Sequence, residues 1–147
     1  MSLDALRKFR AQEREALIME LARVTQELVN MEQRCEALEV QLKADAASCL
    51  RLAQQGTMAQ TLLEWEGRLV SKQVSLRQAR EAIGRLTDLW LKTQARLVDA
   101  MQAGKALDRL SERRKAEHEA LVMKREQRVG DETASRRAFL KKGEYRR

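Results

Sequence analysis

The chain has no proline and few aromatic side chains. Among its 147 residues are two Trp, one Tyr, two Phe and six Gly. A compact globular domain of this size would bury many more aromatic and β-branched residues, so the composition argues against one. Asp, Glu, Lys and Arg make up 35% of the chain. Together with abundant Ala, Leu and Gln, this charge is typical of long helices and coiled coils, and it predicts an all-α fold.

Long apolar runs and metal-binding residues are also scarce. No run approaches the roughly 20 apolar residues that span a bilayer, and the start "MSLDALRKFR" lacks the apolar region of a signal peptide, so we expect a cytoplasmic protein. Cys35 and Cys49 are 14 positions apart, about 21 Å along one helix, which is too far for a disulfide. We interpret both as small core residues. With His118 as the single histidine, we expect no metal, cofactor or small-molecule ligand.

A strict heptad pattern runs through the stretch "LARVTQELVNMEQRCEALEVQL". Its apolar residues alternate in steps of three and four. The a positions are Leu21, Leu28, Cys35 and Leu42, and the d positions are Val24, Met31 and Leu38. A seam this narrow suits one facing helix rather than a globular core.

The facing helix is predicted within the same chain. Gly56 followed by Thr57 is the best break signal in the first hundred residues, since Gly can end a helix and Thr can cap the next one. A second seam follows, and its heptad-spaced members are Leu62, Leu69, Leu76, Ile83, Trp90 and Leu97. Two seams joined by a short turn predict an antiparallel coiled-coil hairpin. We expect a single domain with helices over about 4–54 and 59–140, a turn at about 55–58 and a basic tail to 147.

A turn centred near Gly56 pairs residues whose numbers sum to about 113. The second seam fades just after Leu110, where the first helix would run out of residues. The second helix is therefore predicted to be the longer one and to overhang, with Gly130 as a further candidate break. Residues 105–147 hold 14 Lys and Arg against 8 Asp and Glu, a net of +6 out of the chain's +7. The overhang is either a solvated helix or a docking element for an acidic partner.

Catalysis and nucleic-acid binding are weakly supported. A helical hairpin offers no cleft that could desolvate a catalytic group, and the chain has no nucleotide-binding motif; we expect no enzyme. A sequence pI near 9.8 permits phosphate contacts, but acids interrupt the basic residues and aromatics for base stacking are missing. A basic nucleic-acid-associated hairpin therefore stays a minor alternative, beside a structural adaptor whose seams pair between chains.

Local segments and architecture together resemble the flagellar FliJ proteins. The tail segment "DETASRRAF", preceded by "KREQR", is similar to a charged helical segment near the end of that family, with Gly130 where the family commonly has an apolar residue. The start "LDALRKFRAQEREAL" is similar to the family's opening. The injectisome proteins of the YscO type share this architecture and are the nearest competitor.

The resemblance implies a stalk of the flagellar type III export apparatus. Such a protein inserts into the hexameric export ATPase, promotes its assembly and activity, contacts the cytoplasmic domain of the membrane export gate, and handles export chaperones, peripherally at the inner membrane. We expect the ring-facing residues in the overhang, at Arg113, Arg114, Lys115, Lys124, Arg125 and Arg128. The turn-proximal end would face the gate, with candidates at Gln41, Leu42, Leu52, Leu69 and Gln73, most of which the seam explains equally well.

Overall fold

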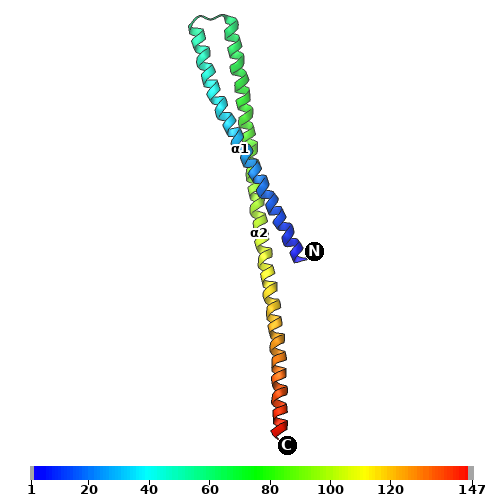
Figure 1. Cartoon of the computed structure of the whole chain (residues 1–147). Helices are drawn as coiled ribbons and strands as arrows, with labels where there is room; N and C mark the ends of the chain where they lie inside the picture. Colours follow the sequence, from blue (N-terminus) through cyan, green and yellow to red (C-terminus); the bar gives the residue numbers. More distant parts are fainter. Residues whose placement is uncertain (1, 146–147) are drawn as a thin grey trace. The chain divides into compact units, whose positions relative to one another are not determined.

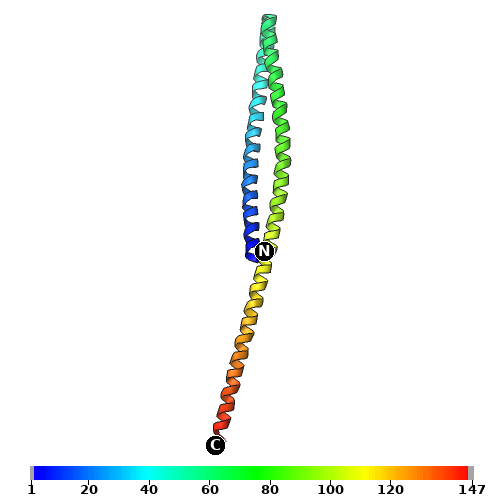
Figure 2. The same cartoon turned by 90° about the vertical axis from the view of Figure 1, so that its right-hand side faces the viewer.

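The computed structural model describes residues 2–145, with side chains for residues 2–143. It consists of two helices, α1 (Leu3–Gln54) and α2 (Ala59–Tyr145). By their contacts, residues 12–101 form one unit, and residues 1–11 with 102–147 form another. In the larger unit α1 and α2 lie side by side and antiparallel on either side of the turn (Figures 1 and 2). The predicted all-α coiled-coil hairpin, with a longer second helix, is confirmed.

Gly56 ends α1 as predicted. Its φ is 74°, the left-handed region in which a residue without Cβ is not strained. The Gly56 N–H donates to the Ala53 carbonyl at 3.3 Å, and the Thr57 N–H donates to the Leu52 carbonyl at 3.1 Å, the pattern of a Schellman motif. The Thr57 hydroxyl also donates to the Leu52 carbonyl, at 2.7 Å. Thr57 therefore satisfies the end of α1, whereas the sequence had suggested a cap for α2.

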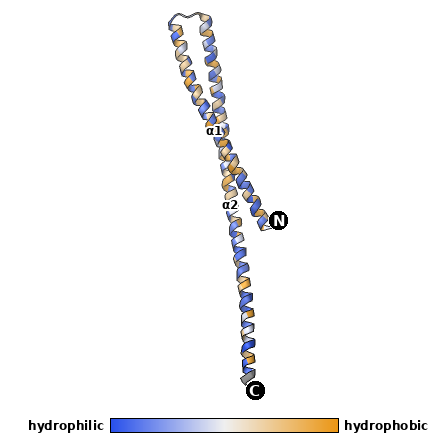
Figure 3. Ribbon diagram, in the orientation of Figure 1, coloured by the Kyte–Doolittle hydropathy of each residue, from blue (hydrophilic) through white to orange (hydrophobic). Residues whose placement is uncertain are grey.

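The core of the larger unit is a line of small and medium side chains along the seam. Cys35, Leu76 and Ala79 form a buried cluster, and four further seam residues pack against it: Met31, Leu38, Leu42 and Ile83. Val24 and Ala100 are buried elsewhere along the line. The hydropathy colouring in Figure 3 shows these apolar positions recurring at intervals along both helices. The position of Cys35, facing residues 76–80, agrees with the prediction.

Polar contacts between the helices define the register. The Trp90 indole N–H donates to Thr25 Oγ1 at 3.0 Å, Arg80 bonds to Glu39 at 3.0 Å, and the Lys72 ammonium pairs with Asp45 inside the seam, where both side chains are largely covered. The residue numbers of these pairs sum to 115, 119 and 117, above the predicted value of about 113. Side chains lean toward the N-terminus of their own helix. A side chain therefore makes its contact about one residue closer to the N-terminus of its own helix than its Cα lies. In an antiparallel pair both helices contribute this shift, and both contributions raise the sum of the contacting residue numbers.

The smaller unit pairs the start of α1 with the middle of α2. The Arg7 guanidinium bonds to Asp108 at 3.0 Å and to Ser111 at 3.2 Å. Ser111 is the last half-buried residue of α2, and every described side chain from Glu112 to Gly143 is exposed. The seam therefore ends where it was predicted to end. The helix itself continues to Tyr145, through Gly130 and past the expected end near residue 140, because one glycine weakens a helix by only about 1 kcal/mol.

Candidate partner-binding surfaces

The six predicted ring-facing residues lie on the part of α2 that has no helix beside it. We call residues 112–145 the C-terminal segment. Arg113, Arg114, Lys115, Lys124, Arg125 and Arg128 are all exposed. Within the described residues, none of the six makes an ion pair or a hydrogen bond through its side chain. Their charges are therefore available to a partner, although no contact of the structure identifies that partner.

The heptad register of α2 continues into the C-terminal segment, but its residues change character. Counting on from Leu107 and Ser111, the core positions fall at Arg114, His118, Leu121, Arg125 and Arg128. The same positions before residue 108 hold mainly Leu, Ile, Ala and Trp. Cations at core positions oppose pairing with an apolar or a like-charged helix, because a buried charge needs a partner of opposite sign. This substitution of residues explains why the apolar seam stops at Ser111.

Charge is also divided around the helix. At about 100° per residue, Arg113, Lys124, Arg128, Arg114 and Arg125 fall within an arc of roughly 120°. On the opposite side Glu112, Glu119 and Glu126 repeat every seven residues. Lys115 lies on that acidic side, so the structure brings together five of the six predicted residues and separates the sixth. The predicted set was not chosen by angle around the helix, which is why it spans both sides.

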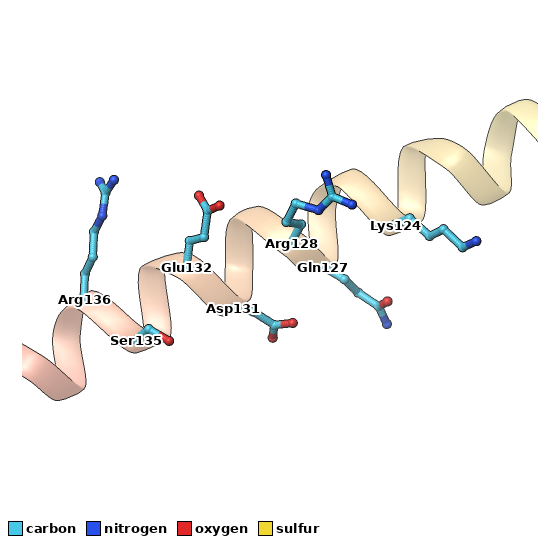
Figure 4. Close-up of a pocket in the computed structure, with 7 residues that line it drawn as sticks. All are labelled: Lys124, Gln127, Arg128, Asp131, Glu132, Ser135 and Arg136. Carbon is cyan, nitrogen blue, oxygen red and sulfur yellow. The ribbon is translucent and has the colours of Figure 1, made fainter.

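Acidic residues follow the basic arc toward the end of the helix. Figure 4 shows Arg128, Glu132 and Arg136 on one side of the helix, one turn apart, with Gln127 and Asp131 pointing to the other side. These side chains line a shallow groove of about 600 Å³ on the surface of a single helix. Such a groove has no enclosed interior that would desolvate a ligand. We therefore treat it as helix surface.

The turn-proximal candidates divide between the interface and the surface. Leu42 packs against the Cys35 cluster, Leu69 is half-buried on the seam, and the Leu52 carbonyl accepts the bonds that close α1. Gln41 and Gln73 alone are exposed. Three exposed apolar side chains near the turn were missed, Leu50 at 61%, Met58 at 75% and Leu63 at 66% exposure. Leu50 and Leu63 are apolar residues outside the heptad positions, and Met58 lies in the turn before α2 begins.

One ion-pair network on α1 lowers the pKa of a carboxyl group. Arg23 bonds to Glu20 at 2.5 Å and 3.2 Å, and to Glu27 at 2.5 Å. The hydrogen bonds from Arg23 lower the pKa of Glu20 below its ordinary value of 4.5. Both side chains are about half exposed, so the network is a surface feature of the helix and contributes little to stability. It supplies no perturbed group of the kind that marks a catalytic site.

The described residues contain no group of three or more His, Cys, Asp or Glu side chains placed to hold a metal ion. Neither helix has, in its described part, an apolar stretch long enough to cross a bilayer.

Taken together, a two-helix hairpin with an exposed, charged continuation of one arm defines a coiled-coil interaction protein. Comparison with known families is specific: the model described as "Flagellar FliJ protein" matches residues 1–143. The chain belongs to the FliJ family and is a flagellar export-related coiled-coil protein. No curated protein and no solved structure matches the chain.

Proposed function

We propose that this protein is a stalk of the flagellar export apparatus. Residues 112–128 of its C-terminal segment insert into the hexameric export ATPase and promote assembly and activity of the ring. The observation that carries this proposal is the exposed basic arc, three of whose five cations occupy core positions of a heptad pattern without a facing helix in the described structure. The protein acts in the cytoplasm and associates peripherally with the inner-membrane apparatus, where it also meets export chaperones.

The chemistry of the arc favours an acidic protein partner. A helix that carries Arg at its core positions cannot pair with a copy of itself, because like charges would be buried together. Acidic side chains lining a ring would satisfy these cations. Exposed charge pairs are individually weak, at about 0–1 kcal/mol. A stalk held by several such pairs can exchange its contacts between successive subunits of the ring.

The turn-proximal end is proposed to face the cytoplasmic domain of the export gate. Gln41 and Gln73 are the exposed members of the predicted set. The exposed apolar residues Leu50, Met58 and Leu63 add the kind of side chain that protein interfaces bury. The half-buried Leu42, Leu52 and Leu69 support this end by holding the two helices together, and they reach a partner only at their edges.

The alternatives differ in the partner that they require. An injectisome stalk of the YscO type would use the same geometry, but the family match is to the flagellar protein. A structural adaptor needs seams that pair between chains, whereas Thr25–Trp90 and Glu39–Arg80 join the helices of one chain. A nucleic-acid-associated hairpin needs stacking residues, and the C-terminal segment alternates cations with acids. The stalk is therefore the function that the observations support best.

The test is charge reversal in the C-terminal segment. Arg113→Glu, Arg114→Glu and Lys115→Glu together should leave helical content and thermal unfolding near wild type, because these side chains are exposed and unpaired in the described structure. The triple variant should lose stimulation of the flagellar export ATPase hexamer. Stimulation by the wild type should weaken as salt rises and screens the charges. The measurements are circular dichroism and ATPase rate.

A matched control makes the same charge change elsewhere. Lys43→Glu, Arg77→Glu and Arg85→Glu reverse three exposed cations on the paired helices and should keep ATPase stimulation. Truncation after Leu110 should remove it. If the charge-reversed and truncated proteins both stimulate the ATPase as well as the wild type, the C-terminal segment is not the ring-binding element and the proposed orientation of the stalk is wrong.

A further inference from the structure

A second basic cluster lies beyond the predicted ring-facing residues. Residues 136–143 contain Arg136, Arg137, Lys141 and Lys142 and no acid, a net of +4 in eight positions. Residues 112–128 hold six cations and four acids, a net of +2 in seventeen positions. Asp131 and Glu132 separate the two clusters. Positive charge is therefore densest at the end of α2, outside the residues assigned to the ATPase.

This end of the helix also exposes its two largest apolar side chains. Phe139 is 78% and Leu140 is 65% exposed, and no other helix covers them in the described structure. At about 100° per residue they share one side of α2, with Arg136 between them and with Arg137 and Lys142 about 60° beyond either edge. A pair of apolar side chains bordered by cations is the arrangement of a helix that lies at a membrane surface.

We infer that residues 136–143, which we call the basic–apolar end, bind the surface of a bilayer containing anionic phospholipids. The cations attract the negatively charged headgroups. Phe139 and Leu140 enter the boundary between headgroups and acyl chains, which removes their apolar area from water. The long Arg and Lys side chains keep their charges at headgroup level while their methylene groups follow the apolar side chains down.

The apolar pair favours a lipid surface over other polyanions. A nucleic acid or a uniformly acidic surface would satisfy the four cations but would leave Phe139 and Leu140 in water, whereas a bilayer surface accepts both kinds of side chain. The basic arc at residues 113–128 offers the contrast, since Glu117 lies among its cations on the same side of the helix. The lipid contact uses none of the six residues of the proposed ATPase site, so each can fail without the other.

The experiment is co-sedimentation of the full chain with vesicles. Wild type should bind vesicles containing phosphatidylglycerol and should not bind vesicles of phosphatidylcholine alone, and the binding should decline as salt rises. Arg136→Gln, Arg137→Gln, Lys141→Gln and Lys142→Gln together should weaken binding at least about 100-fold, since each cation near an anionic surface contributes about five-fold. Phe139→Ala with Leu140→Ala should weaken it about ten-fold while the cations remain.

The control neutralises four exposed cations on the paired helices: Lys43→Gln, Arg77→Gln, Arg85→Gln and Lys92→Gln. It carries the same change in net charge and should bind these vesicles within a few-fold of wild type. Equal losses in both quadruple variants would show that only net charge matters and would overturn the inference. Failure of wild type to bind phosphatidylglycerol vesicles would also overturn it.

A competition experiment distinguishes a lipid site from a general polyanion site. Polyglutamate and duplex DNA should compete poorly with the vesicles, and the Phe139→Ala, Leu140→Ala variant should not alter their weak binding. Tighter binding to either polymer than to the vesicles would mean that an acidic macromolecule is the ligand, contrary to the inference. The tail variants should still stimulate the export ATPase, which separates this result from the test of the stalk.

Discussion

At the scale of single residues, Cys35 belongs to the buried cluster between the helices. It is 7% exposed and packs with Leu76 and Ala79. Cys35→Glu would bury a carboxylate without a cation beside it, and we expect a loss of about 3 kcal/mol in unfolding free energy. Urea unfolding followed by circular dichroism measures this loss. Gln33→Glu is the control, because the same charge at an exposed position should change stability little; equal stability of the two variants would contradict the packing of Cys35.

At the same scale, Asp45 and Lys72 show what a polar pair does inside a seam. Both occupy d positions of the heptad pattern, and their ion pair is mostly covered. A slip of one helix by a turn would separate them and leave two charges without partners, which is costly in a partly desolvated interface. The pair therefore disfavours alternative registers. Thr93, also a d residue, is buried without such a penalty because its hydroxyl donates to the Leu89 carbonyl at 2.8 Å.

At the scale of elements, the paired helices were predictable because heptad spacing leaves few alternatives. The seams from Leu21 and from Leu62 require one partner each, and Gly56 offered the break that lets one chain supply both. The finer details were not predictable in this way. The contact register depends on how far long side chains such as Trp90 lean along their helix. The role of Thr57 depends on which helix end its hydroxyl reaches. The helix continues through Gly130 because the good helix formers around it offset the low helix propensity of glycine.

The register of the two helices can be measured by crosslinking. With Cys35 and Cys49 changed to Ala, the pair Thr25→Cys and Trp90→Cys should be joined by a short thiol crosslinker within one chain, because these side chains touch in the structure. Mass spectrometry identifies the product. Thr25→Cys with Leu91→Cys is the control, since Leu91 is 54% exposed and points away from the interface. Products found only between chains would instead support an intermolecular coiled coil.

At the scale of the whole molecule, the arrangement of charge on the C-terminal segment follows largely from the sequence. The exposed cations of the C-terminal segment were predicted from the point where the apolar seam stops. Their division into a basic arc and an acidic stripe was already present in the spacing of Glu112, Glu119 and Glu126. The separation of Lys115 from the arc follows from the same spacing. The exposure of Phe139 and Leu140 needed the structure, because a sequence does not show whether another element covers an apolar pair.

The cations at core positions also predict that this molecule does not self-associate through its C-terminal segment. Arg114→Leu, His118→Leu, Arg125→Leu and Arg128→Leu would join Leu121 in a continuous apolar seam on the C-terminal segment. Such a seam pairs with a copy of itself. We expect light scattering to show at least a doubling of mass that grows with concentration, whereas wild type stays monomeric. The same four positions changed to Gln remove the charges without adding apolar surface, so this variant should stay monomeric too. Dimers of the Gln variant would show that repulsion alone keeps the chains apart, and a monomeric Leu variant would mean that these positions do not form one face.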